Sequence, residues 1–253
     1  MITEAWVRDR TRELDGASPE ELLTWVAGRF GSRAGLTCSF GGAGLVLAHM
    51  VSRIAPETPV IFLDTDFLFP ETLGVKDEFA RRFDIRLVEL HPLLTPEEQA
   101  ERHGEALWKR DPDLCCHLRK VEPMERALAG LDAWIAGLRR EQSATRATIA
   151  PLEYHELADG RPLLKVMPLF AWTKGQVHDY IERHNLPTNP LLNRGYTSIG
   201  CTHCTRPVAF GEHERAGRWA GKGKTECGLH TFTRRSPGAP AELTFPEPAG
   251  DRP

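Results

Sequence analysis

The sequence predicts an α/β fold, with a mostly parallel sheet and helices on both faces. Short apolar runs that suit buried strands alternate with stretches of helical periodicity between residues 19 and 185. Such alternation is typical of a parallel sheet covered on both sides. The length of 253 residues, with 41% hydrophobic and 26% charged residues, suits a globular protein with a sizeable core. We therefore expect a single α/β domain over residues 1–230.

The first elements are a helix at 19–31, with Ser18 as its N-cap, and a strand–turn–helix unit over 35–55. The run "PVIFLDT" (59–65) predicts a second buried strand. The stretch 70–83 then has helical spacing, with a proline near its start, where proline is favourable.

Three further strands follow at 85–90, 133–138 and 162–170, with helical stretches at about 117–129 and 173–185. Thr173 is a good N-cap for the last of these helices. Residues 231–253 are rich in proline and glycine and have little apolar periodicity, which predicts a mobile tail.

The charge balance and the apolar runs restrict the function classes. The net charge of −3 shows no global basic excess, so we expect no generic nucleic-acid binding. No apolar run approaches the ~18 residues needed to span a membrane, and "MITEAWVRDR" lacks the layout of a secretory signal. We expect a cytoplasmic, reducing environment, in which six cysteines indicate metal or redox chemistry rather than disulfides.

The turn "CSFGGAG" places Ser39, Gly41 and Gly42 where the first strand passes into a helix. Glycines there let backbone N–H groups approach an anion, and the helix N-terminus adds a partial positive charge. The second strand ends in "LDT", residues 63–65, at the sheet edge where open α/β folds bind ligands. A nucleotide or phosphate site is predicted, and a turn that needs glycine only for packing is the alternative.

Four cysteines form two close pairs, Cys115 with Cys116 and Cys201 with Cys204. Such a set suits zinc or an iron–sulfur cluster. Adjacent cysteines rarely reach one ion but can each reach a different iron, so we favour a [4Fe–4S] cluster over zinc. A redox dithiol in CxxC and buried packing cysteines in CC are the alternatives.

The two remaining cysteines differ from each other. Cys38 lies in the first strand and is expected to be a small core residue. Cys227, in "KTECGLH", has no partner, and Lys224, Glu226 and His230 surround it in the sequence. An unpaired thiol in such a polar segment is a candidate nucleophile, since nearby cations favour a thiolate.

Basic side chains gather beside the cysteines and at strand ends. Alone, each is more simply a solvated surface charge, but together they suit an anion of phosphate or sulfate character. The groups are Arg119 and Lys120, then Arg139, Arg140 and Arg146, then Arg206, Arg215 and Arg218.

The CC…CxxC set, "LDTDFLFPET", "RREQS", "CTRP" and terminal "ECGLH" together resemble the assimilatory adenylyl-sulfate reductases of the PP-loop superfamily. The resemblance covers about residues 35–230. "ECGLH" also occurs in the phosphoadenylyl-sulfate reductases, which lack the four cysteines, so the set favours the substrate without a 3′-phosphate. Reduction of the 3′-phosphorylated form, or of both, is the alternative.

The resemblance implies that Cys227 attacks the sulfur of adenylyl sulfate, forming S-sulfocysteine and AMP, and that thioredoxin or glutaredoxin then releases sulfite. The catalytic segment, about 219–230, must then move between the site and the donor. Cys115, Cys116, Cys201 and Cys204 would hold a cluster with a structural and electrostatic role. The implied substrate-binding residues are Ser39, Gly41, Gly42, Leu63, Asp64, Thr65, Lys120, Arg139, Arg140, Arg215, Arg218 and His230.

One departure from the family is Ala43–Gly44, where similar members usually carry acidic residues, which affects loop rigidity and affinity. His203, inside the CxxC, is expected to lie beside the ligands rather than among them. Two rival functions are a PP-loop tRNA thiolase, whose SGGxDS-type loop is absent, and an iron–sulfur redox sensor, which leaves "ECGLH" unexplained. The helix at 19–31 is a candidate contact for a homo-oligomer.

Overall fold

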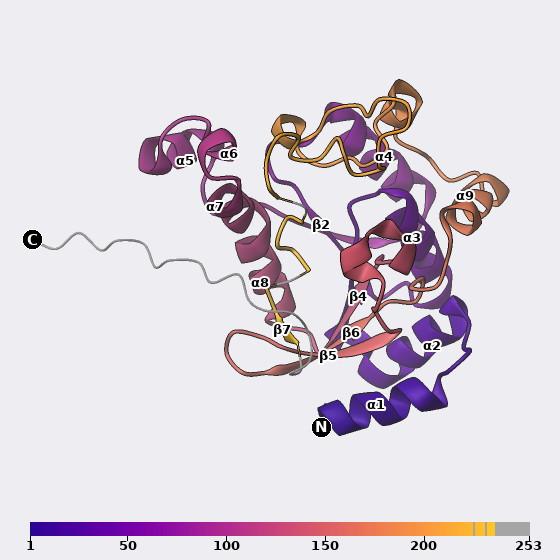
Figure 1. Ribbon diagram of the computed structural model, residues 1–253. Coiled ribbons are helices and arrows are strands. Elements are labelled where there is room, and N and C mark those ends of the chain that lie inside the picture. The colour runs from indigo at the N-terminus through magenta and orange to yellow at the C-terminus, as the bar shows by residue number, and fades with distance from the viewer. Residues whose placement is uncertain (225, 231, 236–253) are drawn as a thin grey trace, which may run out of the picture.

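The computed structural model describes residues 1–224, 226–230 and 232–235, and within them the chain forms one mostly parallel sheet (Figure 1). The strand order is β3-β2-β1-β4-β6-β5-β7, in which neighbours from β3 to β6 pair in parallel and β5 and β7 pair antiparallel. The predicted fold class is therefore confirmed. The strands are β1 Ala34–Thr37, β2 Pro59–Leu63, β3 Arg86–Leu90, β4 Ala133–Ala136, β5 Leu152–Glu156, β6 Pro162–Val166 and β7 Arg234–Arg235.

The helices begin where the local sequence satisfies their first N–H groups. Ser18 and Thr173 each form a capping box with the residue three positions on, and Pro70 occupies the first turn of α4. The helices are α1 Glu4–Glu13, α2 Pro19–Phe30, α3 Gly42–Ile54, α4 Pro70–Arg82, α5 Pro96–His103, α6 Leu107–Arg110, α7 Pro112–Cys116, α8 Glu122–Leu128 and α9 Lys174–Arg183.

Each face of the sheet has its own apolar core, because successive strand residues point to opposite sides. Leu36, Val60 and Ile135 pack with residues of α2, α3, α4 and α9. On the other face, Ile61 and Trp134 pack with residues of α8. Helices thus cover both faces, as predicted.

Several elements were not predicted. Helices α1 and α5–α7 carry few apolar residues, and β5, "LEYHE", mixes polar and apolar side chains. The predicted helix at 117–129 begins as a π-helical turn, His117–Val121, before α8. Arg234–Arg235, assigned to the predicted tail, adds a strand beside β5. The rest of that tail, 236–253, lies outside the described residues.

The sheet has a switch point between β1 and β4, where the strand order reverses direction. Ligands of open α/β sheets bind at such a point, outside the carboxyl ends of the strands. Among the described residues, no helix combines the length and apolar character that a membrane span requires.

Candidate active site

A cavity of about 350 Å³ opens at the switch point. Its walls include the turn after β1, the end of β2 and residues 137–138 after β4. Residues 197–200, 215–219 and 226–230 close the other side. The volume is within the range of small-molecule sites, so segments far apart in the sequence enclose one ligand-sized space.

The glycine-rich turn forms one wall. Gly41 is the N-cap of α3 and Gly42 its first residue, and no side chain of the described residues caps the helix. The first N–H groups of α3 are therefore available to an anion in the cavity. Phe40 enters the turn at φ 50°, a left-handed conformation rare for a bulky residue. Its ring packs between Phe62 and Phe79 in the core, which holds the strained turn in place.

The departure at Ala43–Gly44 has a packing explanation. A Cβ on Gly44 would lie 3.1 Å from Cys38 Sγ, tighter than ordinary contact. Gly137 lies so close to the same loop that a Cβ added to it would be 3.3 Å from the Ala43 carbonyl carbon. Cys38 is buried, as predicted, and burial raises the pKa of its thiol to about 12. The loop is therefore fitted around a neutral core thiol.

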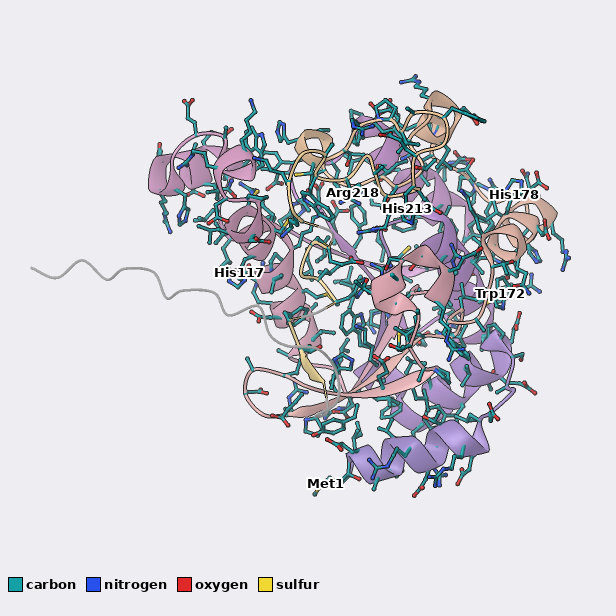
Figure 2. All side chains as sticks on the ribbon, in the orientation of Figure 1. Met1, His117, Trp172, His178, His213 and Arg218 are labelled. Atoms are coloured by element: carbon teal, nitrogen blue, oxygen red, sulfur yellow. The ribbon has the colours of Figure 1, made fainter. Side chains whose placement is uncertain are left out.

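Four cations line the cavity: Lys120, Arg146, Arg215 and Arg218. Burial disfavours a charged Lys120, but the thiolates of Cys201 and Cys227 outweigh that effect and raise its pKa above the ordinary value. Arg218 comes from the loops above the sheet (Figure 2) and packs over Gly200, where a Cβ would lie 2.5 Å from its guanidinium carbon.

Cys227 lies half-buried in the wall of this cavity. The preceding residue, Glu226, accepts hydrogen bonds from Arg146 Nη2 at 2.9 Å and Arg215 Nη2 at 3.2 Å through Oε2. Its second oxygen, Oε1, is buried and has no hydrogen-bond partner among the described residues. Lys224, which lies just before this part of the chain, pairs with Asp113 of α7. The segment therefore brings both a thiol and a carboxylate to the cations.

His230 also lines the cavity, and its ring stacks on Trp134 with centroids 5.4 Å apart. Burial, followed by the charges of Lys165 and Arg146, lowers the pKa of His230 well below its ordinary value. The imidazole is therefore neutral at physiological pH. Its Nδ1 is buried without a hydrogen-bond partner in the described part of the chain.

All four paired cysteines line a second, small cavity next to the first. Cys115 and Cys116 end α7, and the π-helical turn follows them directly. The CxxC loop is held against the segment after β2, because Thr202 N donates to Phe67 O at 2.7 Å. Folding thus brings the two predicted pairs together, and Lys120 contributes to the walls of both cavities.

The chemistry of this second cavity fits an iron–sulfur cluster. Within the part of the chain that the structure describes, Arg119 Nη2 is buried without a hydrogen-bond partner, and Arg119 lines the cavity beside the four thiols. Thr65 Oγ1 lies 3.3 Å from Cys201 Sγ, and, against burial, Lys120 and this contact lower the pKa of that thiol. Among the described residues, no group of three or more His, Cys, Asp or Glu is arranged for a metal ion. Burial raises the pKa of the other three thiols, to about 12 for Cys115 and about 11 for Cys116. Four soft sulfur atoms with an unpaired donor beside them nevertheless suit a cluster, which would bind them as thiolates.

Aromatic rings cover the thiol cavity. Trp108 stacks on His203 with centroids 3.8 Å apart, and Phe67 packs edge-on against both rings. His203 therefore lies in the wall beside the four thiols.

The structure brings most of the predicted substrate residues to the large cavity, but not Asp64, Arg139 and Arg140. The Arg139 guanidinium bonds Glu141 and the Trp172 carbonyl, and Arg140 Nε donates to Ile149 O at 2.9 Å. Asp64 Oδ1 accepts from Asp66 N at 2.9 Å. Arg146, from the same basic group in the sequence, lines the cavity instead. Two short 3₁₀ turns, Arg140–Gln142 and Ala144–Arg146, decide which arginine faces inward, and no sequence pattern predicts them.

The fold and the site define a class: an α/β protein of PP-loop type with a cavity lined by four cations at the switch point. A solved structure of Candida glabrata FMN adenylyltransferase with ATP shares this fold at a TM-score of 0.53 and 16% identity, over 89% of this chain and 78% of that chain. Phosphoadenylyl-sulfate reductase from Candida auris, in a phosphate complex, is more similar, with a TM-score of 0.71 and 33% identity. That match covers 81% of this chain and 98% of the other.

The chain belongs to the phosphoadenosine phosphosulfate reductase domain family, whose model matches residues 33–207. It is 45% identical to adenosine 5′-phosphosulfate reductase of Halalkalibacterium halodurans over 225 residues, 88% of this chain and 96% of that protein. It is 47% identical to the enzyme of that name from Streptomyces coelicolor over 219 residues, 87% of this chain and 91% of the other. The resemblance noted in the sequence is therefore confirmed.

Proposed function

We propose that this protein reduces adenylyl sulfate to sulfite and AMP, with Cys227 as the nucleophile and thioredoxin or glutaredoxin as the electron donor. The observation that carries the proposal is a single cavity that joins an uncapped helix N-terminus, four cations and a cysteine. The names of the similar proteins support the same substrate. We place the reaction in the reducing cytoplasm, in keeping with six free cysteines.

The charges support a doubly negative substrate together with a thiolate. Four cations line the cavity, together with one carboxylate, that of Glu226, which pairs with Arg146 and Arg215. The phosphate and sulfate groups of adenylyl sulfate and the thiolate of Cys227 then complement the three remaining positive charges. The turn at 39–42 and the N-terminus of α3 would hold the nucleotide, and the arginines would hold the sulfate and phosphate oxygens.

In the first step, the Cys227 thiolate attacks the sulfate sulfur, and the bond from that sulfur to the bridging oxygen breaks. AMP leaves with the electron pair of that bond, and cations at the phosphate stabilise the developing charge. In the second step, a donor thiolate attacks Cys227 Sγ and sulfite leaves. The donor's second thiol then resolves the mixed disulfide, so the donor supplies both electrons.

Cys115, Cys116, Cys201 and Cys204 would hold a [4Fe–4S] cluster, which when bound supplies concentrated charge beside Lys120 rather than electrons. Lys120 then faces the cluster site on one side and the substrate on the other. Its ammonium can respond to both, which supports an electrostatic role for the site.

The test is sulfite release from adenylyl sulfate and from its 3′-phosphorylated form, with anaerobically purified protein, thioredoxin and a thioredoxin-reducing system. We expect sulfite from adenylyl sulfate and a strong preference for it. Comparable rates on both would retain the mechanism but make the protein a dual-substrate reductase. No sulfite from either substrate, in protein that retains its cluster absorbance, would overturn the proposal.

A further inference from the structure

Lys165 is a lysine inside the core. It lies in β6, within the otherwise apolar run "PLLKV", and is 1% exposed. Burial of an ammonium is costly unless the charge is well partnered. Residues that break the local pattern of a buried strand are expected where function requires them.

The contacts of Lys165 lead to the catalytic segment. Its Nζ donates to the carbonyl oxygen of His230 at 3.2 Å and lies 4.3 Å from the centroid of the Trp134 ring. Trp134 is its direct neighbour across the β4–β6 pair, and Glu153 stands opposite on β5. The charge is therefore held by a ring, a carbonyl and the field of an adjacent carboxylate.

Trp134 serves as a platform for the same segment. The rings of His230 and Phe232 pack on it, with centroids at 5.4 and 6.1 Å. Its own Nε1 donates to Thr37 Oγ1 at 2.8 Å, at the end of β1 where the substrate cavity begins. Both the backbone and the side chain of His230 are thus fixed relative to the cavity.

The positions of Cys227 and His230 are linked by a tight turn. Phe232 N donates to Gly228 O at 3.2 Å, and Gly228 has φ +82°, which favours glycine. Beyond the turn, β7 pairs with β5, and Thr233 bonds the buried His155. Figure 1 shows this segment passing beside α8 to end at β7. Loss of the Lys165 contact would therefore loosen residues 226–230 and leave the β7 attachment in place.

We propose that Lys165 is a positioning residue that holds Cys227 over the substrate cavity through the carbonyl of His230. Lys165 itself does not line that cavity. The inference rests on the proposed function, because it assigns Lys165 a part in sulfur transfer to Cys227. The reaction would then require the Lys165 ammonium to align Cys227, although this ammonium does not contact the substrate.

The test compares Lys165→Met with a matched control, Lys76→Met. Lys76 is also buried over an aromatic ring, that of Phe62 at 5.4 Å, but its ammonium pairs with Glu89 of β3 rather than with the C-terminal segment. Two quantities are measured: the rate of iodoacetamide labelling of Cys227 without substrate, followed by peptide mass, and the single-turnover release of AMP from adenylyl sulfate without a thiol donor. Lys165→Gln, which retains polarity but is too short to reach His230, serves if the methionine variant fails to fold.

Lys165→Met is expected to label Cys227 about 3- to 10-fold faster, because the segment opens more often. It is expected to release AMP about 10- to 100-fold more slowly, as for loss of a charged hydrogen bond that aligns a reacting group. Its cluster absorbance stays unchanged, and Lys76→Met matches the parent in both rates. A merely structural role would not raise the labelling rate of Cys227 and lower the transfer rate together while the cluster absorbance stays unchanged.

Unchanged labelling and unchanged transfer in the Lys165 variants would overturn the proposal, as would faster labelling with normal transfer. Slower transfer with normal labelling would also overturn it, since the segment would not have been released. If the parent protein released no AMP yet labelling rose only in the Lys165 variants, the anchor would stand and the proposed function would fail.

Discussion

The two sides of the substrate cavity are built in different ways. The side formed by residues 37–65 is backbone: a strained turn, an uncapped helix start and a strand end, all fixed by the core. The side formed by residues 197–230 is made of charged side chains on loops, held by ion pairs such as Arg215 with Glu226. Binding geometry on the first side therefore depends on packing, whereas on the second it depends on charges that the substrate itself can displace.

The largest effect is expected on the charged side, at Cys227. The Cys227→Ser variant should lose all measurable sulfite release, because a serine hydroxyl is not ionised at neutral pH and cannot form the intermediate. Its cluster absorbance should equal that of the parent protein, since Cys227 is not among the four thiols of the second cavity. If Cys227→Ser still released sulfite, a residue other than Cys227 would have to be the nucleophile.

A second comparison uses two arginines of the same short segment. Arg146→Leu should lower kcat/KM for adenylyl sulfate by about 10- to 100-fold, as expected for loss of a charged hydrogen bond to the substrate. Arg140→Leu is the control, because Arg140 bonds a backbone carbonyl and packs over Phe170. The Arg140→Leu control should lower the melting temperature but leave kcat/KM for adenylyl sulfate close to that of the parent protein. An equal loss of kcat/KM in both would mean that the segment acts through its fold alone.

Glu226→Gln tests whether the carboxylate competes with the substrate for cations. It removes the charge that Arg146 and Arg215 share. AMP should bind about 3- to 10-fold more tightly to the variant, measured by calorimetry. Glu212→Gln, in an exposed pair with Arg206, should leave AMP affinity unchanged. Weaker AMP binding to Glu226→Gln would show that the carboxylate organises the arginines instead of competing.

The backbone side is tested by the close contact of Gly44 with Cys38. Gly44→Ala should cost about 1–3 kcal/mol of unfolding free energy, because the added Cβ overlaps Sγ. In a Cys38→Ala background, the same change should become neutral or stabilising, since alanine is the better helix former. Urea unfolding of the four proteins gives the coupling, and additive effects would refute the packing account.

The smallest effect concerns acid stability. Burial, followed by the charges of His184 and Arg53, lowers the pKa of His49 to about 4, whereas an unfolded histidine titrates near ~6.5. The unfolded state therefore binds the proton more readily, and stability present above pH ~6.5 is lost as pH falls toward 4. His49→Gln should reduce the fall in melting temperature between pH 7 and 5 by about 2–4 °C. His178→Gln, at an exposed site, should not.

The backbone side of the cavity was largely predictable, because its signals are local. Ser39, Gly41 and Gly42 lie next to one another where a strand meets a helix, and the sheet brings Thr65 to the same edge. For the charged side, the sequence predicted that arginines would line the cavity, but not which ones. A group of arginines indicates an anion, but the turns that point Arg146 inward and Arg140 outward depend on tertiary contacts.

The fold divides in the same way. Apolar strands and capped helices were predictable, whereas β5 was not, because its polar residues meet partners from distant segments. Glu153 and His155 face Lys165 and Thr233 across the sheet. Lys165 itself looked like part of an ordinary strand in the sequence. Its contact with His230 exists only once the C-terminal segment has folded back over the sheet.

The most direct test of the central claim, that Cys227 accepts the sulfur group within this cavity, is the mass of the protein after incubation with adenylyl sulfate and no thiol donor. We predict one sulfo group per chain on the peptide that contains Cys227, with an equal amount of AMP released and reversal by added thioredoxin. Release of AMP without an adduct on Cys227, or an equal adduct in Cys227→Ser, would contradict the account.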